Sequence, residues 1–169
     1  MTPPATRFPV VLAPATGADV PAIQGLLESV REWLLARGHP QWQRGFPADW
    51  VRGEVAAGRF WVAHDAAGLV TTVRLTSEDA TWAARASASA LYVHTLAVRR
   101  DRAGEGIGAG VLAWAAAQAA ACGRGRLRLD FVAPNPRLEA YYAGVGFVVV
   151  GDAASGGAPV RLMERATGA

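Results

Sequence analysis

The sequence predicts one α/β domain in which strands and helices alternate, with strand hairpins near both ends. Three observations lead to this prediction. Of the 169 residues, 51% are hydrophobic, which is enough for a core of its own. Short strand-like runs alternate with segments of helical apolar spacing. A dense glycine stretch, RDRAGEGIGAG at 100–110, separates a strand-like run from an apolar helix.

The first half of the chain predicts two helices and a hairpin. Apolar residues recur at helical spacing from Val20 to Leu35, and Gly38 follows where a helix end is expected. The sequence DAAG separates two apolar runs and predicts a hairpin turn. The polar connection TSEDATWAARASAS has no clear assignment. The expected elements are a strand at 7–12, helices at 20–35 and 48–57, and strands at 60–64 and 69–75.

The second half predicts alternating strands and helices and a closing pair of strands. Pro134 ends one strand, Pro136 fits the first turn of a helix, and Gly146 ends that helix. The expected elements are strands at 91–98, 127–132, 147–150 and 160–164, and helices at 106–121 and 135–143. No repeat or linker divides the chain, so we expect a single domain over residues 1–169.

The positive charge of the chain comes from arginine alone. The formal net charge is +3 and the sequence contains no lysine, which excludes a Schiff base or a P-loop lysine. The arginines are spread from Arg7 to Arg165, as on a solvated surface, so we expect no nucleic-acid partner.

The cysteine and histidine content and the hydropathy exclude further classes of protein. A single cysteine, Cys122, excludes an internal disulfide, and scattered histidines without zinc spacing predict no metal site. The N-terminal MTPPATRFPVV lacks a sustained apolar core, and the run VLAWAAAQAAA is too short to span a bilayer. We therefore expect a cytoplasmic protein without a membrane partner.

The residue spacing of the glycine stretch matches the dinucleotide-binding fingerprint. Gly104, Gly106 and Ala109 satisfy G-x-G-x-x-A, and Asp130 ends the next strand, where a ribose-binding acid is sought. That fingerprint places its first glycine directly at the strand end, whereas 99–103 intervene here. Too little chain follows for a doubly wound sheet. An NAD(P)-binding oxidoreductase is therefore the less favoured interpretation.

A different phosphate site fits a loop that leaves the strand before the helix begins. Successive backbone N–H groups near a helix N-terminus can converge on a pyrophosphate, and glycine allows close approach of its oxygens. Arg99, Arg100 and Arg102 are placed to pair with outlying phosphate groups.

Two motifs in this order resemble the GNAT superfamily of N-acetyltransferases. LAV at 96–98 followed by AGEGIG at 103–108 resembles the family's Leu-x-Val and Arg/Gln-Gly-x-Gly-Ile-Gly, with Ala103 in place of Arg or Gln. NPRLEAYYAGVGF at 135–147 resembles N-x-x-A-x-x-L-Y-x-x-x-G-F, with Leu138 and Tyr141 as departures. The resemblance is best over residues 90–150.

This resemblance implies a fold, a co-substrate and a reaction. The fold is a mixed, mostly antiparallel central sheet of about six to seven strands, flanked by helices, with splayed central strands. The reaction moves an acetyl group from acetyl-CoA to a primary amine by direct attack in a ternary complex. The implied acetyl-CoA contacts are Leu96, Ala97, Val98, Arg102, Ala103, Gly104, Glu105, Gly106, Ile107, Gly108, Ala109, Asn135 and Tyr142.

The resemblance also implies roles in proton transfer. Tyr142 would protonate the departing thiolate, the alternative being a tyrosine packed on the core with its hydroxyl in water. Asn135 would bind the pantetheine arm, cap its helix, or do both. His94 shares a strand face with Leu96 by simple alternation and is one candidate base, and Glu78 is another. A structural histidine and a solvated turn are the alternatives.

The acceptor is expected to be a small-molecule or peptide amine. The resemblance implies that the loops with Trp42 and Trp82 line the acceptor pocket, where these rings can cage its ammonium group. Asp79 and Asp130 would add opposite charge, and tryptophans that cover the sheet are the alternative. The identity of the acceptor and the formation of a homodimer stay open. Because Ala103 lacks the family's side chain, a non-catalytic acetyl-CoA sensor or partner-binding module also stays open.

Overall fold

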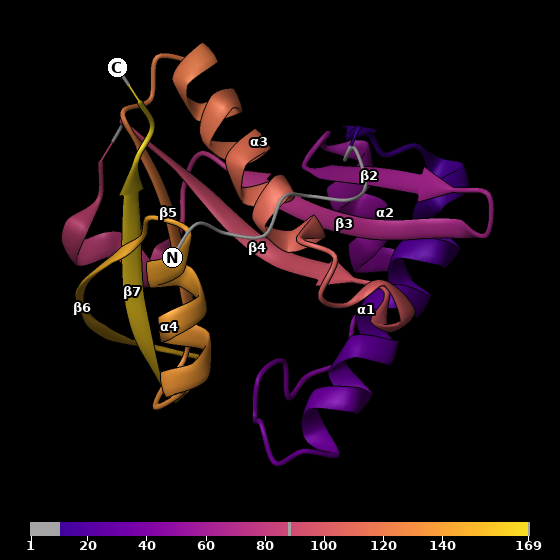
Figure 1. The fold of residues 1–169 in the computed structure, drawn as a ribbon, viewed down its shortest axis with the longest axis horizontal. Coiled ribbons are helices and arrows are strands. Elements are labelled where there is room, and N and C mark those ends of the chain that lie inside the picture. The colour runs from indigo at the N-terminus through magenta and orange to yellow at the C-terminus, as the bar shows by residue number, and fades with distance from the viewer. Residues whose placement is uncertain (1–10, 88, 169) are drawn as a thin grey trace. The chain divides into compact units, whose positions relative to one another are not determined.

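The computed structural model describes residues 11–87 and 89–168, and Figure 1 follows them from the N-terminus to the C-terminus. The first described elements are β1 (Ala13–Pro14), η1 (Gly17–Asp19), α1 (Val20–Leu35), α2 (Ala48–Ala56), β2 (Phe60–Asp65) and β3 (Gly68–Thr76). The 3-10 helix η2 (Ala80–Arg85) then lies in the polar connection that the sequence left unassigned.

The second half follows the predicted order closely. Its elements are β4 (Ala90–Val98), η3 (Arg100–Arg102), α3 (Ile107–Ala121), β5 (Arg126–Val132), α4 (Pro136–Gly144), β6 (Val148–Ser155) and β7 (Ala158–Ala166). The last two strands are longer than expected, because a two-glycine turn at Gly156 and Gly157, both with positive φ, closes them into a hairpin.

One expected strand is only partly testable. Residues 7–10 lie outside the described part of the chain, and residues 11–12 have no regular structure. The first described strand is instead the two-residue β1, where Ala13 is paired with Val62 of β2.

The strands form a seven-stranded sheet in the order β1-β2-β3-β4-β5-β7-β6. β1, β2 and β3 pair antiparallel in sequence, and so do β5, β7 and β6. β4 and β5 run parallel, and their ladder joins only Ala90–Tyr92 to Arg126–Arg128. This short ladder agrees with splayed central strands, and the predicted mixed, mostly antiparallel sheet flanked by helices is confirmed.

The described residues group into two compact units, each built from stretches that are distant in sequence. The N-terminal unit contains residues 11–74 and 95–111, and the C-terminal unit contains 75–94 and 112–168. The single-domain organisation stays a prediction.

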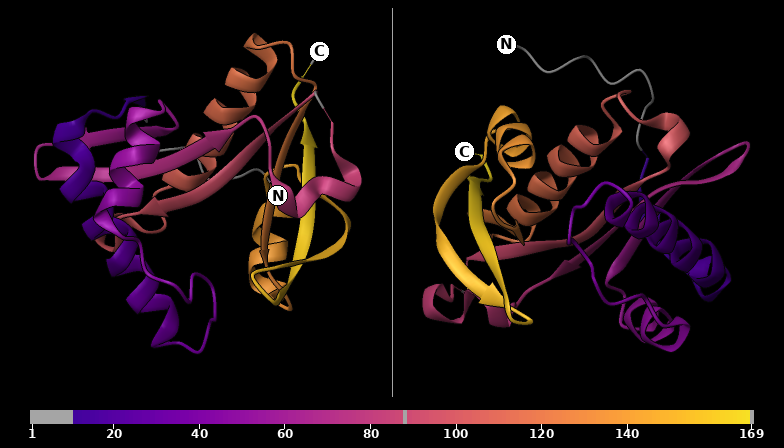
Figure 2. Two further views of the ribbon diagram at one scale, coloured as in Figure 1. Left: turned by 180° about the vertical axis from the view of Figure 1, so that it is seen from behind. Right: turned by 90° about the horizontal axis from the view of Figure 1, so that it is seen from below.

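The core of the N-terminal unit forms where α1 and α2 cover one face of its strands, as Figure 2 shows. Ile23, Leu27, Val51 and Phe60 are fully buried there. They occupy the helical and strand positions that the apolar spacing predicted. The buried core residues of this unit are Val20, Ile23, Leu26, Leu27, Val30, Phe46, Val51, Val55, Phe60, Val62, Leu69 and Ala97.

The core of the C-terminal unit contains a buried arginine. The Arg128 guanidinium donates to Glu164 Oε2 at 3.1 Å and to the Arg85 carbonyl at 2.7 Å, and it lies 4.7 Å from the centre of the Trp82 ring. These partners compensate for the removal of its charge from water. Trp82 is only 1% exposed and packs with Tyr92 and Leu162.

We expect Leu27→Ala to lower the free energy of unfolding by about 2 to 5 kcal/mol, because it leaves a cavity in the core. Leu35→Ala, on the same helix but at a side chain that is 38% exposed, is the control and should change it by less than about 0.5 kcal/mol. Urea unfolding measures both. Similar losses for the two variants would contradict the assigned core face.

Candidate active site

The glycine loop of the N-terminal unit has the backbone that its sequence requires. It runs from η3 to the first turn of α3, and Gly104 and Gly106 have φ of 85° and 78°. A Cβ on Gly104 would meet nothing within 4 Å, so glycine serves the left-handed backbone there rather than a lack of space. The first N–H groups of α3 have no acceptor within the helix. Such a loop suits a pyrophosphate.

Arginine side chains fasten the start of this loop to the β2–β3 turn. Arg99 Nη2 donates to Asp65 Oδ2 at 2.9 Å, and Arg102 also donates to Asp65. The Arg99 hydrogen bond, more than any other cause, lowers the pKa of Asp65 to about 2. Arg102 further pairs with Glu105 at 2.8 Å. Arg102 and Glu105, both expected to contact the cofactor, thus have structural partners inside the loop.

The strand before the loop is anchored through its backbone. Ala97 is buried, and its carbonyl accepts a hydrogen bond from Thr71 Oγ1 at 2.8 Å. Thr95 has φ of 45°, a left-handed backbone that is uncommon for a threonine within a strand. Simple alternation of side chains does not extend through such a residue, and the shared face of His94 and Leu96 stays a prediction.

The second motif forms helix α4 of the C-terminal unit. The Asn135 side chain accepts a hydrogen bond from the Leu138 N–H at 3.1 Å, and Pro136 occupies the first helical turn. Asn135 is therefore an N-cap, and a cofactor contact by its side chain stays a prediction.

Tyr142 of α4 lies among aromatic rings. Its ring centre is 5.7 Å from Phe131 and 5.8 Å from Phe147, while the neighbouring Tyr141 is 42% exposed. Burial, followed by Tyr141 and Asp130, raises the pKa of Tyr142 well above the usual 10. The phenol therefore stays protonated throughout the physiological range and is available as a proton donor.

His94 of β4 is held by two elements of the same unit. Its Nε2 lies 2.9 Å from Thr76 Oγ1 at the end of β3 and 3.7 Å from Asp79 Oδ2. Asp79 is the N-cap of η2, where its Oδ1 accepts a hydrogen bond from the Thr81 N–H at 2.8 Å. The imidazole is 18% exposed, so it is mostly shielded yet reachable by solvent.

Asp130 of β5 completes this group. Burial, and then a hydrogen bond and charge repulsion from Asp79, raises the pKa of Asp130 to about 7. The group of Thr76, Asp79, His94 and Asp130 thus combines an imidazole with two carboxyl groups in a poorly solvated place. Two of its members were expected to bind an ammonium and one to act as a base, whereas Thr76 was missed.

Three other expected side chains have different surroundings. Glu78 is exposed, and its carbonyl accepts a hydrogen bond from the Thr76 hydroxyl at 2.8 Å, which agrees with the solvated-turn alternative. The buried Trp82 packs in the core and cannot cage a substrate, so that expectation was wrong. Trp42 is half-buried against Phe46 in the N-terminal unit, and its carbonyl accepts from Arg31.

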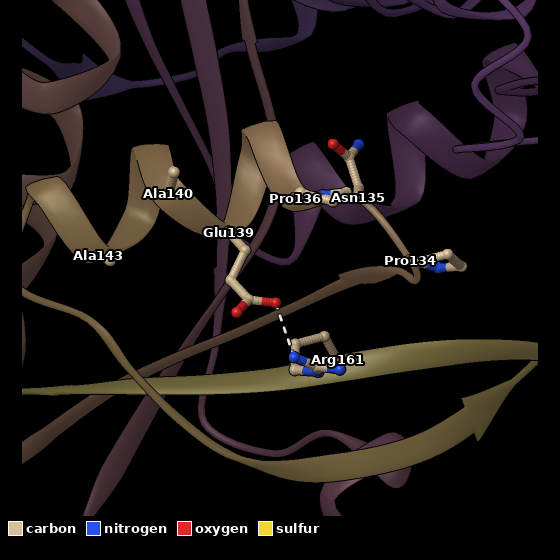
Figure 3. Close-up of a pocket in the computed structure, with 7 residues that line it drawn as sticks. All are labelled: Pro134, Asn135, Pro136, Glu139, Ala140, Ala143 and Arg161. Carbon is tan, nitrogen blue, oxygen red and sulfur yellow. Dashed lines mark hydrogen bonds and ion pairs between the residues drawn. The ribbon is translucent and has the colours of Figure 1, made fainter.

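A hollow of about 350 Å³ opens beside the N-terminus of α4 (Figure 3). Glu139 and Arg161 face each other in it, 2.7 Å apart, so its two charged groups neutralise each other. Its lining residues are Pro134, Asn135, Pro136, Glu139, Ala140, Ala143 and Arg161.

Residues 11–87 and 89–168 contain no group of three or more His, Cys, Asp or Glu side chains placed to hold a metal ion. Over the same residues, no helix has the length and apolar character needed to cross a bilayer.

The Asp130 carboxyl should make stability depend on pH. The folded chain binds more protons than the unfolded chain between about pH 4 and 7, so this contribution is present below pH 4 and lost as the pH rises through 7. A pKa change from 3.8 to about 7 corresponds to at most about 4 kcal/mol. Between pH 4 and 8, we expect the free energy of unfolding of the wild type to fall by about 2 to 4 kcal/mol more than that of Asp130→Asn. Urea unfolding at each pH measures this difference.

Asp49→Asn is the control for this experiment, because the Asp49 side chain is 93% exposed. It should leave the pH profile of the free energy of unfolding unchanged. Parallel profiles for the wild type and Asp130→Asn would contradict the raised pKa.

The cap of α4 predicts a difference between two substitutions. Asn135→Ala removes the acceptor for the Leu138 N–H and should lower the free energy of unfolding by about 1 kcal/mol. Asn135→Asp keeps an acceptor oxygen and should change it by only a few tenths of a kcal/mol. Thermal unfolding separates the two, and an unchanged midpoint for Asn135→Ala would argue against the cap.

Comparison with known proteins gives the chain's relationships. Residues 56–149 match the family model described as acetyltransferase (GNAT) domain. The chain is 35% identical over 151 residues to the uncharacterized N-acetyltransferase YesJ of Bacillus subtilis (strain 168), covering 85% of this chain and 84% of that protein.

Solved structures share the fold. A GNAT-family acetyltransferase from Listeria monocytogenes 4b F2365 superimposes with a TM-score of 0.77 at 21% identity, covering 93% of this chain and 94% of that one. N-acetylglutamate synthase from Neisseria gonorrhoeae, solved with coenzyme A and N-acetyl-glutamate, gives 0.73 at 16% identity, covering 98% of this chain and 37% of that one. Taken with the matched domain and the sequence relative, the two motifs and the mixed sheet have one explanation: this chain belongs to the GNAT acetyltransferase family.

Proposed function

We propose that the chain transfers an acetyl group from acetyl-CoA to a primary amine of a small molecule or peptide, by direct attack in a ternary complex. The observation that carries this proposal is the grouping in one unit of an imidazole, two carboxyl groups and a phenol. Asp79 approaches His94 and hydrogen-bonds Asp130, and Asp130 acts electrostatically on Tyr142. Amine acetylation needs a proton acceptor and a proton donor, and this group offers both.

The glycine loop supports acetyl-CoA as the donor. Its left-handed glycines and the N-terminus of α3 suit a pyrophosphate, and the family uses acetyl-CoA. Because Arg102 is already paired with carboxylates, we expect backbone N–H groups of residues 103–109 to supply most of the contacts. Asn135 would hold the pantetheine arm in addition to capping α4.

Each residue has one task in the proposed reaction. Acetyl-CoA supplies the activated thioester. His94 takes a proton from the acceptor ammonium and leaves a nucleophilic amine. Backbone N–H groups near Leu96 and Ala97 stabilise the negative charge that develops on the carbonyl oxygen. Tyr142 gives its proton to the departing sulfur.

The remaining side chains of the proposed site would bind the acceptor. We propose that Asp79 and Asp130 attract its ammonium, since an ionised carboxylate favours a nearby cation. Trp42 keeps a half-exposed ring that can contact an apolar part of the acceptor.

If Tyr142 donates the proton to the departing sulfur, its replacement should lower kcat only moderately. A phenol whose pKa lies above 10 is a weaker acid than a thiol near 8.5, so its assistance is modest. We expect Tyr142→Phe to lower kcat about tenfold to a hundredfold while acetyl-CoA still binds. Release of free thiol with a panel of amines measures kcat, and calorimetry measures binding.

Tyr141→Phe is the matched control, because this neighbour on α4 is 42% exposed. It should keep the wild-type kcat. Full activity of Tyr142→Phe with normal acetyl-CoA binding would remove the general-acid assignment. Acetyl-CoA binding without thiol release from any amine would favour a non-catalytic module, and binding of NADPH instead would favour an oxidoreductase.

A further inference from the structure

We propose that Thr76 is a positioning residue that fixes the hydrogen of neutral His94 on Nε2, so that Nδ1 receives the proton of the acceptor. The second half of this statement rests on the proposed function, whereas the tautomer itself does not. Thr76 and His94 lie on β3 and β4, eighteen residues apart in sequence.

The direction of the Thr76 hydrogen bonds follows from what each atom can do. A backbone carbonyl only accepts, so the hydroxyl gives its single hydrogen to the Glu78 carbonyl, 2.8 Å away. Thr76 Oγ1 then meets His94 Nε2, at 2.9 Å, as an acceptor. The hydrogen between these two atoms must therefore belong to Nε2.

Asp79 favours the same tautomer. Its Oδ2 lies 3.7 Å from the same Nε2, while its Oδ1 is held by the Thr81 N–H at 2.8 Å. An acceptor on this side of the ring stabilises a hydrogen on Nε2 and opposes a lone pair there. Neutral imidazole has only one N–H, so Nδ1 is the basic nitrogen.

The assignment defines the proton step. The N–H bond of the acceptor ammonium breaks, its electron pair stays on the amine nitrogen, and the proton binds the lone pair of Nδ1. The resulting imidazolium keeps its Nε2–H on Thr76 and faces Asp79, whose negative charge stabilises it. Thr76 acts on the reaction only through the ring of His94.

Nitrogen NMR of ¹⁵N-labelled full-length protein tests the tautomer directly, because long-range couplings distinguish the N–H nitrogen from the lone-pair nitrogen. The chain has three histidines, and His94→Gln identifies the His94 signals by their loss. We expect wild-type neutral His94 to show its hydrogen on Nε2. In Thr76→Val the ratio of the Nε2–H to the Nδ1–H form should fall about threefold to tenfold, the equivalent of one neutral hydrogen bond.

Thr76→Ser is the matched variant, because it keeps the hydroxyl and should keep the wild-type ratio even if Thr76→Val folds poorly. The His64 signals are an internal control, since this histidine contacts Asp19 instead. A wild-type His94 with its hydrogen on Nδ1 would overturn the inference. So would a ratio that is the same in folded Thr76→Val as in the wild type.

Kinetics separate this inference from the proposed function. Thr76→Val should lower kcat with little change in KM for the acceptor, and Thr76→Ser should restore it. If the NMR result holds but His94→Gln keeps full activity, the tautomer assignment stands and the base role of His94 fails.

Discussion

The three-residue parallel ladder between β4 and β5 is the constraint on which the chemistry of the C-terminal unit depends. Hydrogen bonding joins Ala90–Tyr92 to Arg126–Arg128, and beyond it β5 continues its ladder with β7. His94 and Asp130 follow the last paired residues of their strands by two positions each. Where backbone pairing ends, the Asp79 side chain approaches His94 at 3.7 Å and hydrogen-bonds Asp130.

This arrangement places ionisable groups where water solvates them poorly. Burial raises the pKa of Asp130 to about 7 and that of Tyr142 above 10, so near neutral pH the carboxyl is shared between its two forms and the phenol is protonated. Shifts of this size recur at functional sites, although buried structural pairs also produce them. The family membership of the chain favours the functional explanation.

Much of the fold could be predicted from the sequence, because apolar spacing and glycine or proline punctuation are local signals. Helix α1 covers the apolar pattern from Val20 to Leu35 that predicted it, and α4 was predicted within a residue at each end. Gly104 and Gly106 marked the loop, because a left-handed backbone is a property of the single residue. The turn of η2 was missed, since its Asp79 cap is a common side chain in a polar run.

The site was harder to predict, because strand pairing decides which distant residues meet. Thr76 gives no sequence signal for its contact with His94, and the sequence likewise gives no sign of the left-handed backbone of Thr95. Trp82 was expected at a substrate, but the buried Arg128 beneath its ring belongs to a core that only the folded unit reveals. The Arg102 pair with Asp65 likewise depends on a hairpin far away in sequence.

Transfer of a labelled acetyl group from acetyl-CoA to an amine is the decisive measurement of the proposed activity. The full-length chain would be incubated with acetyl-CoA deuterated in its acetyl group and with a panel of amines, and the products analysed by mass spectrometry. We expect a deuterated amide on at least one amine, with one free coenzyme A formed for each acetyl group transferred. Saturable binding of acetyl-CoA without label in any amine or peptide product would contradict it.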